Sequence, residues 1–149
     1  MDRRTMLLGM GAALAASGLA RAEDNPAQVN HMHHHHHAMT KNTPLTEAAA
    51  DCISKGEVCL DHCLDNLEEG DKTMAACARS VNEMLAICRA LQRISAQDAP
   101  SLPKMAALAA DACKRCEDEC RKHEKKHTQC RDCAEACVTC AKACQKYAA

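Results

Sequence analysis

The sequence has almost no aromatic residues: it contains no phenylalanine, no tryptophan and one tyrosine, Tyr147. Large apolar side chains normally dominate the burial in a protein core, so another residue type must fill the interior of this protein. Cysteine is the candidate, because the chain has 13 cysteines. Free cysteine is among the most frequently buried side chains, and its reactivity usually explains its presence better than its packing does.

The chain also lacks an excess of charge of either sign. Lysine and arginine number 19 against 20 aspartates and glutamates, which gives a net charge of -1. This balance is not that of a nucleic-acid binder or of a basic protein that adheres to membrane surfaces. The apolar stretch from Met6 to Ala20 is short and rich in glycine and alanine, so it does not suit a membrane anchor. We expect neither nucleic-acid binding nor stable membrane insertion.

Residues 1–22 have the layout of a targeting segment. Arg3-Arg4-Thr5-Met6-Leu7 resembles the twin-arginine export signal, and Ala20-Arg21-Ala22 has the small-residue pattern of a cleavage site. The resemblance implies a periplasmic protein that folds in the reducing cytoplasm before it is exported. Its thiols would then be able to bind metal before they meet an oxidant.

Residues 23–42 are polar and show no hydrophobic periodicity, which predicts a flexible arm rich in histidine and methionine. Five consecutive histidines, His33 to His37, lie within this arm between Met32 and Met39. A purification tag would have the same composition. The internal position of the run favours a native segment, and both readings stay open.

The sequence pattern of residues 43–149 predicts an all-α domain. We expect an antiparallel up-and-down four-helix bundle with a cysteine-lined core. Thr43 is expected to cap a helix over residues 44–68 that stops at Gly70, and Asp71 to cap a second helix reaching about residue 97. Ser101 is expected to cap a third helix reaching about residue 122, and Thr128 to open a fourth that ends with the chain. Short connections make neighbouring helices antiparallel.

Every cysteine falls on the inward seam of its helix, where residues recur in alternating steps of three and four. The four helices contribute Cys52, Cys59 and Cys63; Cys77 and Cys88; Cys113, Cys116 and Cys120; and Cys130, Cys133, Cys137, Cys140 and Cys144. Ordinary core packing explains one or two such residues, but not five on one helix face. The odd number of cysteines disfavours a disulfide scaffold. Helix axes in a bundle also lie about 8 to 10 Å apart, farther than the Cα–Cα distance that a disulfide spans.

Thiolates select Cu(I), zinc or iron–sulfur clusters. Residues four apart on a helix have Cβ atoms about 5 to 6 Å apart, and a linearly coordinated ion spans about 4.6 Å between two sulfurs. A pair such as Cys59 and Cys63 therefore suits one linear Cu(I). Zinc needs four ligands, which a bundle supplies only across helices, and we expect no grouping in fours of the kind that an iron–sulfur cluster requires.

Charge balance also favours Cu(I). Thirteen buried thiolates are prohibitively costly without compensation, and a monovalent ion on each sulfur brings them near neutrality, so we predict about a dozen Cu(I) ions per chain. A zinc or cadmium thiolate protein with a detoxifying role, and a redox-buffering disulfide module, are the alternatives. Catalysis is not expected, because a stripe of thiols offers no single exposed, activated nucleophile.

One end of the predicted bundle gathers further soft or borderline ligands. In an up-and-down bundle, Met74, His123 and His127 meet Cys63 and Cys77 at the same end. The two histidines are either solvated residues of a charged stretch or part of an opening through which metal arrives. The opposite end, with Leu45, Leu91, Leu102 and Tyr147, has the composition of an apolar plug.

The segments Cys59-Leu60-Asp61-His62-Cys63, Met74-Ala75-Ala76-Cys77 and Cys130-Arg131-Asp132-Cys133 through Cys144 carry a family resemblance. The sequence resembles the bacterial four-helix-bundle copper storage proteins, in particular their exported branch with a twin-arginine signal. This resemblance implies a four-helix bundle, storage of many Cu(I) ions by inward cysteines, and a homotetramer. A copper-requiring enzyme or a copper chaperone is the candidate recipient of the metal.

Overall fold

Four α-helices make up most of the described part of the chain. The computed structural model describes residues 42–148, in which the helices are α1 (Thr43–Glu68), α2 (Ala75–Ala96), α3 (Leu102–Arg121) and α4 (Thr128–Gln145). A short 3-10 helix, η1 (Lys72–Met74), precedes α2. The predicted number of helices and most of their bounds are confirmed, although α4 ends at Gln145 rather than at the end of the chain.

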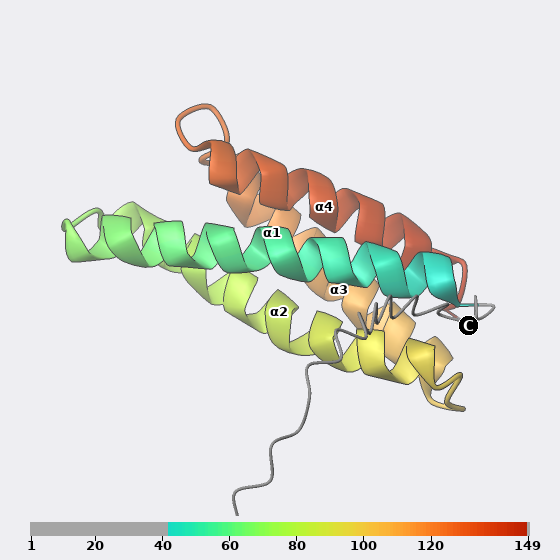
Figure 1. Cartoon of the computed structure of the whole chain (residues 1–149). Helices are drawn as coiled ribbons and strands as arrows, with labels where there is room; N and C mark the ends of the chain where they lie inside the picture. The colour runs from blue at the N-terminus through green and yellow to red at the C-terminus, as the bar shows by residue number, and fades with distance from the viewer. Residues whose placement is uncertain (1–41, 149) are drawn as a thin grey trace, which may run out of the picture. The chain divides into compact units, whose positions relative to one another are not determined.

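The helices form an up-and-down bundle. Each packs against two neighbours, α1 against α2 and α4, and α3 against α2 and α4. The ribbon in Figure 1 shows α1 running between α2 and α4 along the length of the bundle. Short connections at each end make consecutive helices antiparallel. This arrangement turns one face of every helix toward a shared axis, as the sequence predicted.

Local chemistry sets the helix ends. Gly70, with φ of 96°, ends α1 in a backbone conformation that glycine adopts without strain. Asp71 then accepts a hydrogen bond from the backbone N–H of Thr73 at 3.0 Å, which caps η1. The expected cap at Thr43 is wrong by one residue, because α1 begins at Thr43 and Asn42 holds the capping position.

Asn42 belongs to the bundle and not to the arm in which the sequence placed it. Its side chain is 1% exposed, and its Nδ2 donates to the carbonyl of Ser95 and to Oδ1 of Asp98, each at 3.0 Å. Ser95 also shares a 2.9 Å hydroxyl hydrogen bond with Thr46. These bonds join the start of α1 to the end of α2, so the first described residue is already hydrogen-bonded to the bundle.

The core follows the predicted seams. All 13 cysteines are fully buried, and Leu102 is 5% exposed. The inward faces also bury Leu45, Ala49 and Gly56 on α1, Met74, Val81, Met84 and Leu91 at η1 and α2, and Ala106 and Ala109 on α3. Five further residues, Ala78, Leu85, Ala112, Ala134 and Ala136, are buried beside the seams. Tyr147, expected in the apolar plug with Leu45, Leu91 and Leu102, is only half-buried. Small side chains at the inward positions keep the helices close around the sulfurs.

The twin-arginine segment of residues 1–22 and the arm of residues 23–41, with its histidine run, lie outside the described residues. Within residues 42–148, no helix has the length and apolar character needed to cross a membrane.

Candidate metal centre

The thiol side chains of all four helices meet along the axis of the bundle. Every one of the 13 cysteines is a free, buried thiol. Neighbouring Sγ atoms lie 3.5 to 4.0 Å apart, for example 3.5 Å between Cys77 and Cys120 and 4.0 Å between Cys52 and Cys113. A disulfide bond is about 2.05 Å long, so these sulfurs are neighbours without being bonded.

One group of thiols takes a single cysteine from each helix. This four-helix rung consists of Cys52, Cys88, Cys113 and Cys140, whose Sγ atoms all lie within 4.8 Å of one another. Sγ of Cys113 is 3.7 Å from that of Cys88. The thioether sulfur of Met84 lies 3.4 Å from Sγ of Cys52 at the edge of the rung. A second group of four, the mouth group, consists of Cys59, Cys63, Cys77 and Cys130.

Two groups of three thiols connect the groups of four. They are Cys59, Cys120 and Cys133, and Cys116, Cys133 and Cys137. Cys59 is shared with the mouth group, Cys133 is shared between the two groups of three, and Sγ of Cys137 lies 3.8 Å from that of Cys52 in the four-helix rung. Twelve of the 13 thiols therefore form one continuous column, and the last, Cys144, contacts Cys140.

The sulfur geometry corrects one expectation from the sequence. Most neighbouring thiols belong to different helices. The contact between Cys116 and Cys120, at 3.9 Å, is one that lies along a single helix. The expectation that no cysteines group in fours is wrong, because the four-helix rung and the mouth group each hold four. Three sulfurs around one metal at ~2.3 Å are about 4.0 Å apart. The contacts of 3.5 to 4.0 Å are close to this trigonal spacing, and the 4.8 Å limit within each group, which holds for Cys59 and Cys63, also admits the ~4.6 Å span of a linear pair.

Hydrogen bonds between thiols divide the column into acceptors and donors. The pKa values of Cys77, Cys133 and Cys140 are lowered, chiefly by hydrogen bonds from Cys120, Cys116 and Cys113 respectively. Hydrogen bonds to neighbouring thiols, followed by burial, raise the pKa values of Cys59, Cys63, Cys88, Cys120, Cys137 and Cys144. Each group of three or four thiols thus contains one sulfur that its neighbours stabilise as a thiolate.

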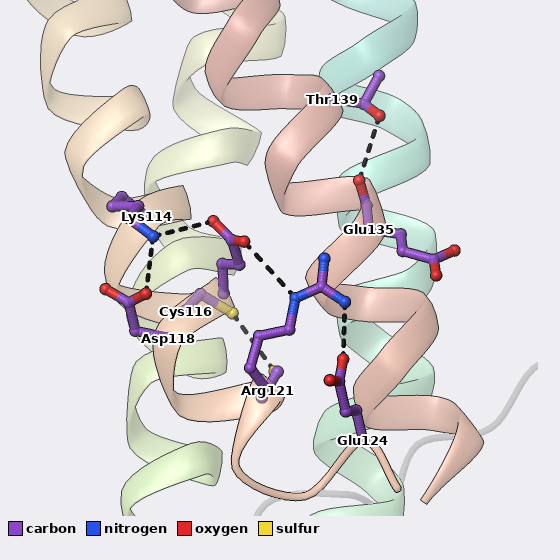
Figure 2. Close-up of polar contacts among 9 residues, drawn as sticks. Lys114, Cys116, Asp118, Arg121, Glu124, Glu135 and Thr139 are labelled. Atoms are coloured by element: carbon purple, nitrogen blue, oxygen red, sulfur yellow. Dashed lines mark hydrogen bonds and ion pairs between the residues drawn. The ribbon is translucent and has the colours of Figure 1, made fainter.

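Within the described part of the chain, no charged side chain enters the column. Among residues 42–148, the buried polar side chains are those of Asn42 and Ser95, both at the far end from the mouth group. Ion pairs lie on the outside, as Figure 2 shows for Lys114, Asp118 and Arg121 around α3. Thiolates in the column therefore have no protein cation to balance them, and the counter-charge must arrive with the metal or with protons.

Three histidines stand beside the mouth group. Nε2 of His62 and Nδ1 of His127 share a 2.8 Å hydrogen bond, and the ring centroids of His123 and His127 are 6.4 Å apart. Burial, followed by repulsion from His62 and His123, lowers the pKa of His127, which favours the neutral, metal-binding imidazole. Met74, the other predicted soft ligand at this end, is fully buried.

Sequence reasoning placed His123 and His127 at the mouth but missed His62. His62 lies one residue before Cys63 and off the seam of α1, and Nδ2 of Asn66 donates to its backbone carbonyl at 2.7 Å and lies 3.2 Å from Nε2 of its ring. The signal available was its position between two cysteines near the end of α1. The rotation of α1 that turns it toward α4 is a property of the packed bundle.

Comparisons with known proteins agree on one family. A family model described as copper storage protein matches residues 36–149. A curated relative from Bacillus subtilis, the uncharacterized cysteine-rich protein YhjQ, is 36% identical over 103 residues, which are 69% of this chain and 92% of the relative.

Solved structures with the same fold include copper-loaded proteins. The Cu(I)-bound copper storage protein BsCsp3 is 35% identical, with a TM-score of 0.65 over 70% of this chain and 95% of its own. Apo-Csp3 from Bacillus subtilis is 35% identical, with a TM-score of 0.62 over 71% and 97%. Ccsp from Streptomyces lividans, loaded with 10 copper equivalents, is 27% identical, with a TM-score of 0.66 over 71% and 82%.

Proposed function

The chain belongs to the copper storage protein family, and from that premise we propose that its thiol column stores Cu(I) at close to one ion per cysteine, about a dozen ions per chain. The single observation that carries this proposal is the continuity of the column. The twelve thiols lie in groups of three and four, in which Cys59 and Cys133 each belong to two groups and can bridge two ions, and Cys137 lies 3.8 Å from Cys52 of the four-helix rung. Bridging allows the number of ions to approach the number of sulfurs.

Charge conservation supports the ratio of one ion to one thiol. When Cu(I) replaces the proton of a buried thiol, a singly charged ion enters for each proton that leaves, and the charge of the core does not change. This matters because no cationic side chain within residues 42–148 is buried near the sulfurs. A divalent ion at the same ratio would leave one uncompensated positive charge per thiol, which a dry core strongly disfavours.

The family is a storage family, and the burial of the thiols supports a storage role without catalysis. All 13 cysteines are fully buried. A catalytic thiol must be accessible to its substrate and activated by a base, whereas a stored ion needs only a path to the column. This interior suits the storage of many metal ions and not the turnover of a substrate.

Metal arrives, in this proposal, through the histidine end of the bundle. His62, His123 and His127 lie beside the mouth group, and neutral imidazole binds copper. An ion held there would pass to Cys77, whose hydrogen bonds favour the thiolate, with Met74 as a neighbouring thioether ligand. The half-buried histidines would capture the ion, and the buried sulfurs would retain it.

The cellular setting completes the proposal. The twin-arginine pattern of residues 1–22 supports export to the periplasm after folding in the reducing cytoplasm. The family resemblance supports a homotetramer, and a copper-requiring enzyme or a chaperone would receive the stored ions. We assign residues 23–41, rich in histidine and methionine, to an arm of the exported chain, and residues 42–149 to its metal-binding domain.

An anaerobic Cu(I) titration against a chromophoric competitor tests the proposed function, with the thiols counted in the same sample. We expect the chain to withdraw about one Cu(I) per reduced thiol before the competitor is metallated. Cys144→Ala, which removes one thiol from the end of the column, should lower the capacity by about one ion. Saturation at two or three ions would refute storage along the column.

A further inference from the structure

The column contains two kinds of thiol group, and the difference matters for divalent ions. The four-helix rung and the mouth group each hold four sulfurs, whereas the two connecting groups hold three. We propose that the four-helix rung and the mouth group each bind one Zn²⁺ tetrahedrally when Cu(I) is absent, so that copper loading releases two zinc ions. This inference rests on the proposed function, because both require the same thiols in their reduced form.

The distances within the rung fit a tetrahedral ion. Four sulfurs at ~2.3 Å from a zinc ion lie about 3.8 Å apart along each edge of the tetrahedron. Sγ of Cys113 lies 3.7 Å from that of Cys88 and 4.0 Å from that of Cys52, and all four sulfurs are within 4.8 Å of one another. In the mouth group, Sγ of Cys59 lies 3.9 Å from that of Cys130. Zinc would need shifts of well under 1 Å at the measured edges.

The remaining thiols lack the fourth ligand. Structural zinc sites are closed by four protein ligands, and each connecting group supplies three. Carboxylates and imidazoles would complete such a site, but no such group is buried among residues 42–148. The expected capacity of the column for zinc is therefore two ions, far below its capacity for Cu(I).

Thiols outside the groups of four can stabilise a zinc tetrathiolate by hydrogen bonding to its sulfurs. Such a centre carries two negative charges, which are costly in a dry core unless neighbours donate hydrogen bonds to the sulfurs. Cys137 lies 3.8 Å from Cys52, and Cys120 lies 3.5 Å from Cys77. The S–H group of either thiol lies close enough to donate a hydrogen bond to a zinc-bound sulfur. Thiolates favour Cu(I), so incoming copper displaces zinc without any change of oxidation state.

The test needs a readout specific for sulfur, because His33 to His37 also suit divalent ions. Co²⁺ serves as the probe on the full, reduced chain under anaerobic conditions, since tetrahedral cobalt thiolate gives strong sulfur-to-metal charge-transfer absorption that imidazole does not. We expect this absorption to saturate at two equivalents. Zn²⁺ should then abolish it at two equivalents, and Cu(I) should abolish it as well.

Matched substitutions on α3 locate the sites. Cys113 belongs to the four-helix rung, and Cys116, three residues further along the same helix, does not. Cys113→Ala should halve the cobalt absorption, Cys88→Ala should do the same from α2, and Cys116→Ala should leave it unchanged. Circular dichroism confirms that each variant is helical. Equal losses in Cys113→Ala and Cys116→Ala, or a wild-type chain with no cobalt thiolate absorption, would overturn the inference.

A Cu(I) titration of the same variants separates this inference from the proposed function. Copper storage predicts equal losses of about one ion for Cys113→Ala and Cys116→Ala, since each removes one thiolate charge. A chain that takes up about a dozen Cu(I) ions but shows no cobalt site would refute the zinc sites alone. A chain that saturates at two or three Cu(I) ions would refute the storage function as well.

Discussion

Replacing Gly56 with alanine tests how closely α1 and α2 are packed beside the four-helix rung. A Cβ atom at position 56 would lie 2.7 Å from Cε of Met84, 2.9 Å from Cδ2 of Leu85 and 3.3 Å from Cγ of Leu85. Real Cβ atoms do not approach other heavy atoms below 3.0 Å. Met84 and Leu85 are 0% and 2% exposed, so neither has free space on the solvent side into which it can move.

Two opposing effects decide whether Gly56→Ala stabilises or destabilises the bundle. Alanine is favoured over glycine in a helix interior by about 1 kcal/mol, which would stabilise α1. Overpacking a filled core costs about 1 to 3 kcal/mol, and here the displaced atoms include a branched carbon of Leu85 as well as a flexible methionine tip. We expect Gly56→Ala to lower the free energy of unfolding by about 1 kcal/mol, or the melting temperature by about 4 °C.

The assay is chemical and thermal denaturation of the reduced, metal-free chain, followed by helical circular dichroism. Leu85→Ala provides the matched background, because it removes two of the three atoms that the new Cβ would meet. In that background the remaining contact is the flexible methyl of Met84, which can move into the space that Leu85 vacates. Gly56→Ala should then stabilise the bundle by up to about 1 kcal/mol through the helix preference. A Gly56→Ala variant that is more stable than the wild type would refute the account of this contact.

Three further substitutions have defined outcomes. Asn42→Ala should lower the free energy of unfolding by about 1 to 3 kcal/mol in a denaturant titration, because it removes two hydrogen bonds of a buried side chain, to the carbonyl of Ser95 and to Oδ1 of Asp98; an unchanged midpoint would contradict that role. Glu57→Gln should change stability by less than about 0.5 kcal/mol in the same assay, since its 2.7 Å ion pair with Arg89 is more than half exposed. His62→Ala should slow Cu(I) uptake in stopped-flow measurements and leave capacity unchanged, whereas Asp61→Ala, its exposed neighbour, should change neither; equal rates in all three proteins would contradict the proposed route of arrival.

The inward face of each helix was predictable because helical periodicity is a local property. Cys52, Cys59 and Cys63 recur at the spacing of a buried seam, and the structure buries all three. The grouping of sulfurs was not predictable, because it depends on the axial stagger between helices. Cys52 meets Cys113, 61 residues away, and no pattern along the chain encodes that register.

Residues off the seams were missed for a related reason. Leu85 is buried because α1 approaches α2 closely at Gly56, and His62 reaches His127 because of how α1 is rotated against α4. The sequence placed Asn42 at the end of a polar arm. Its hydrogen-bond acceptors are supplied by Ser95 and Asp98, which are more than 50 residues away. Each of these contacts depends on the tertiary packing of the bundle.

Anomalous diffraction at the copper absorption edge, from crystals of the chain loaded under anaerobic conditions, tests the stored-copper column most directly. We predict about a dozen copper peaks along the bundle axis, bonded to Sγ atoms at ~2.3 Å, with ions in the four-helix rung and in the mouth group. Copper confined to the histidine end, or an interior whose sulfurs are joined as disulfides and carry no metal, would contradict the account.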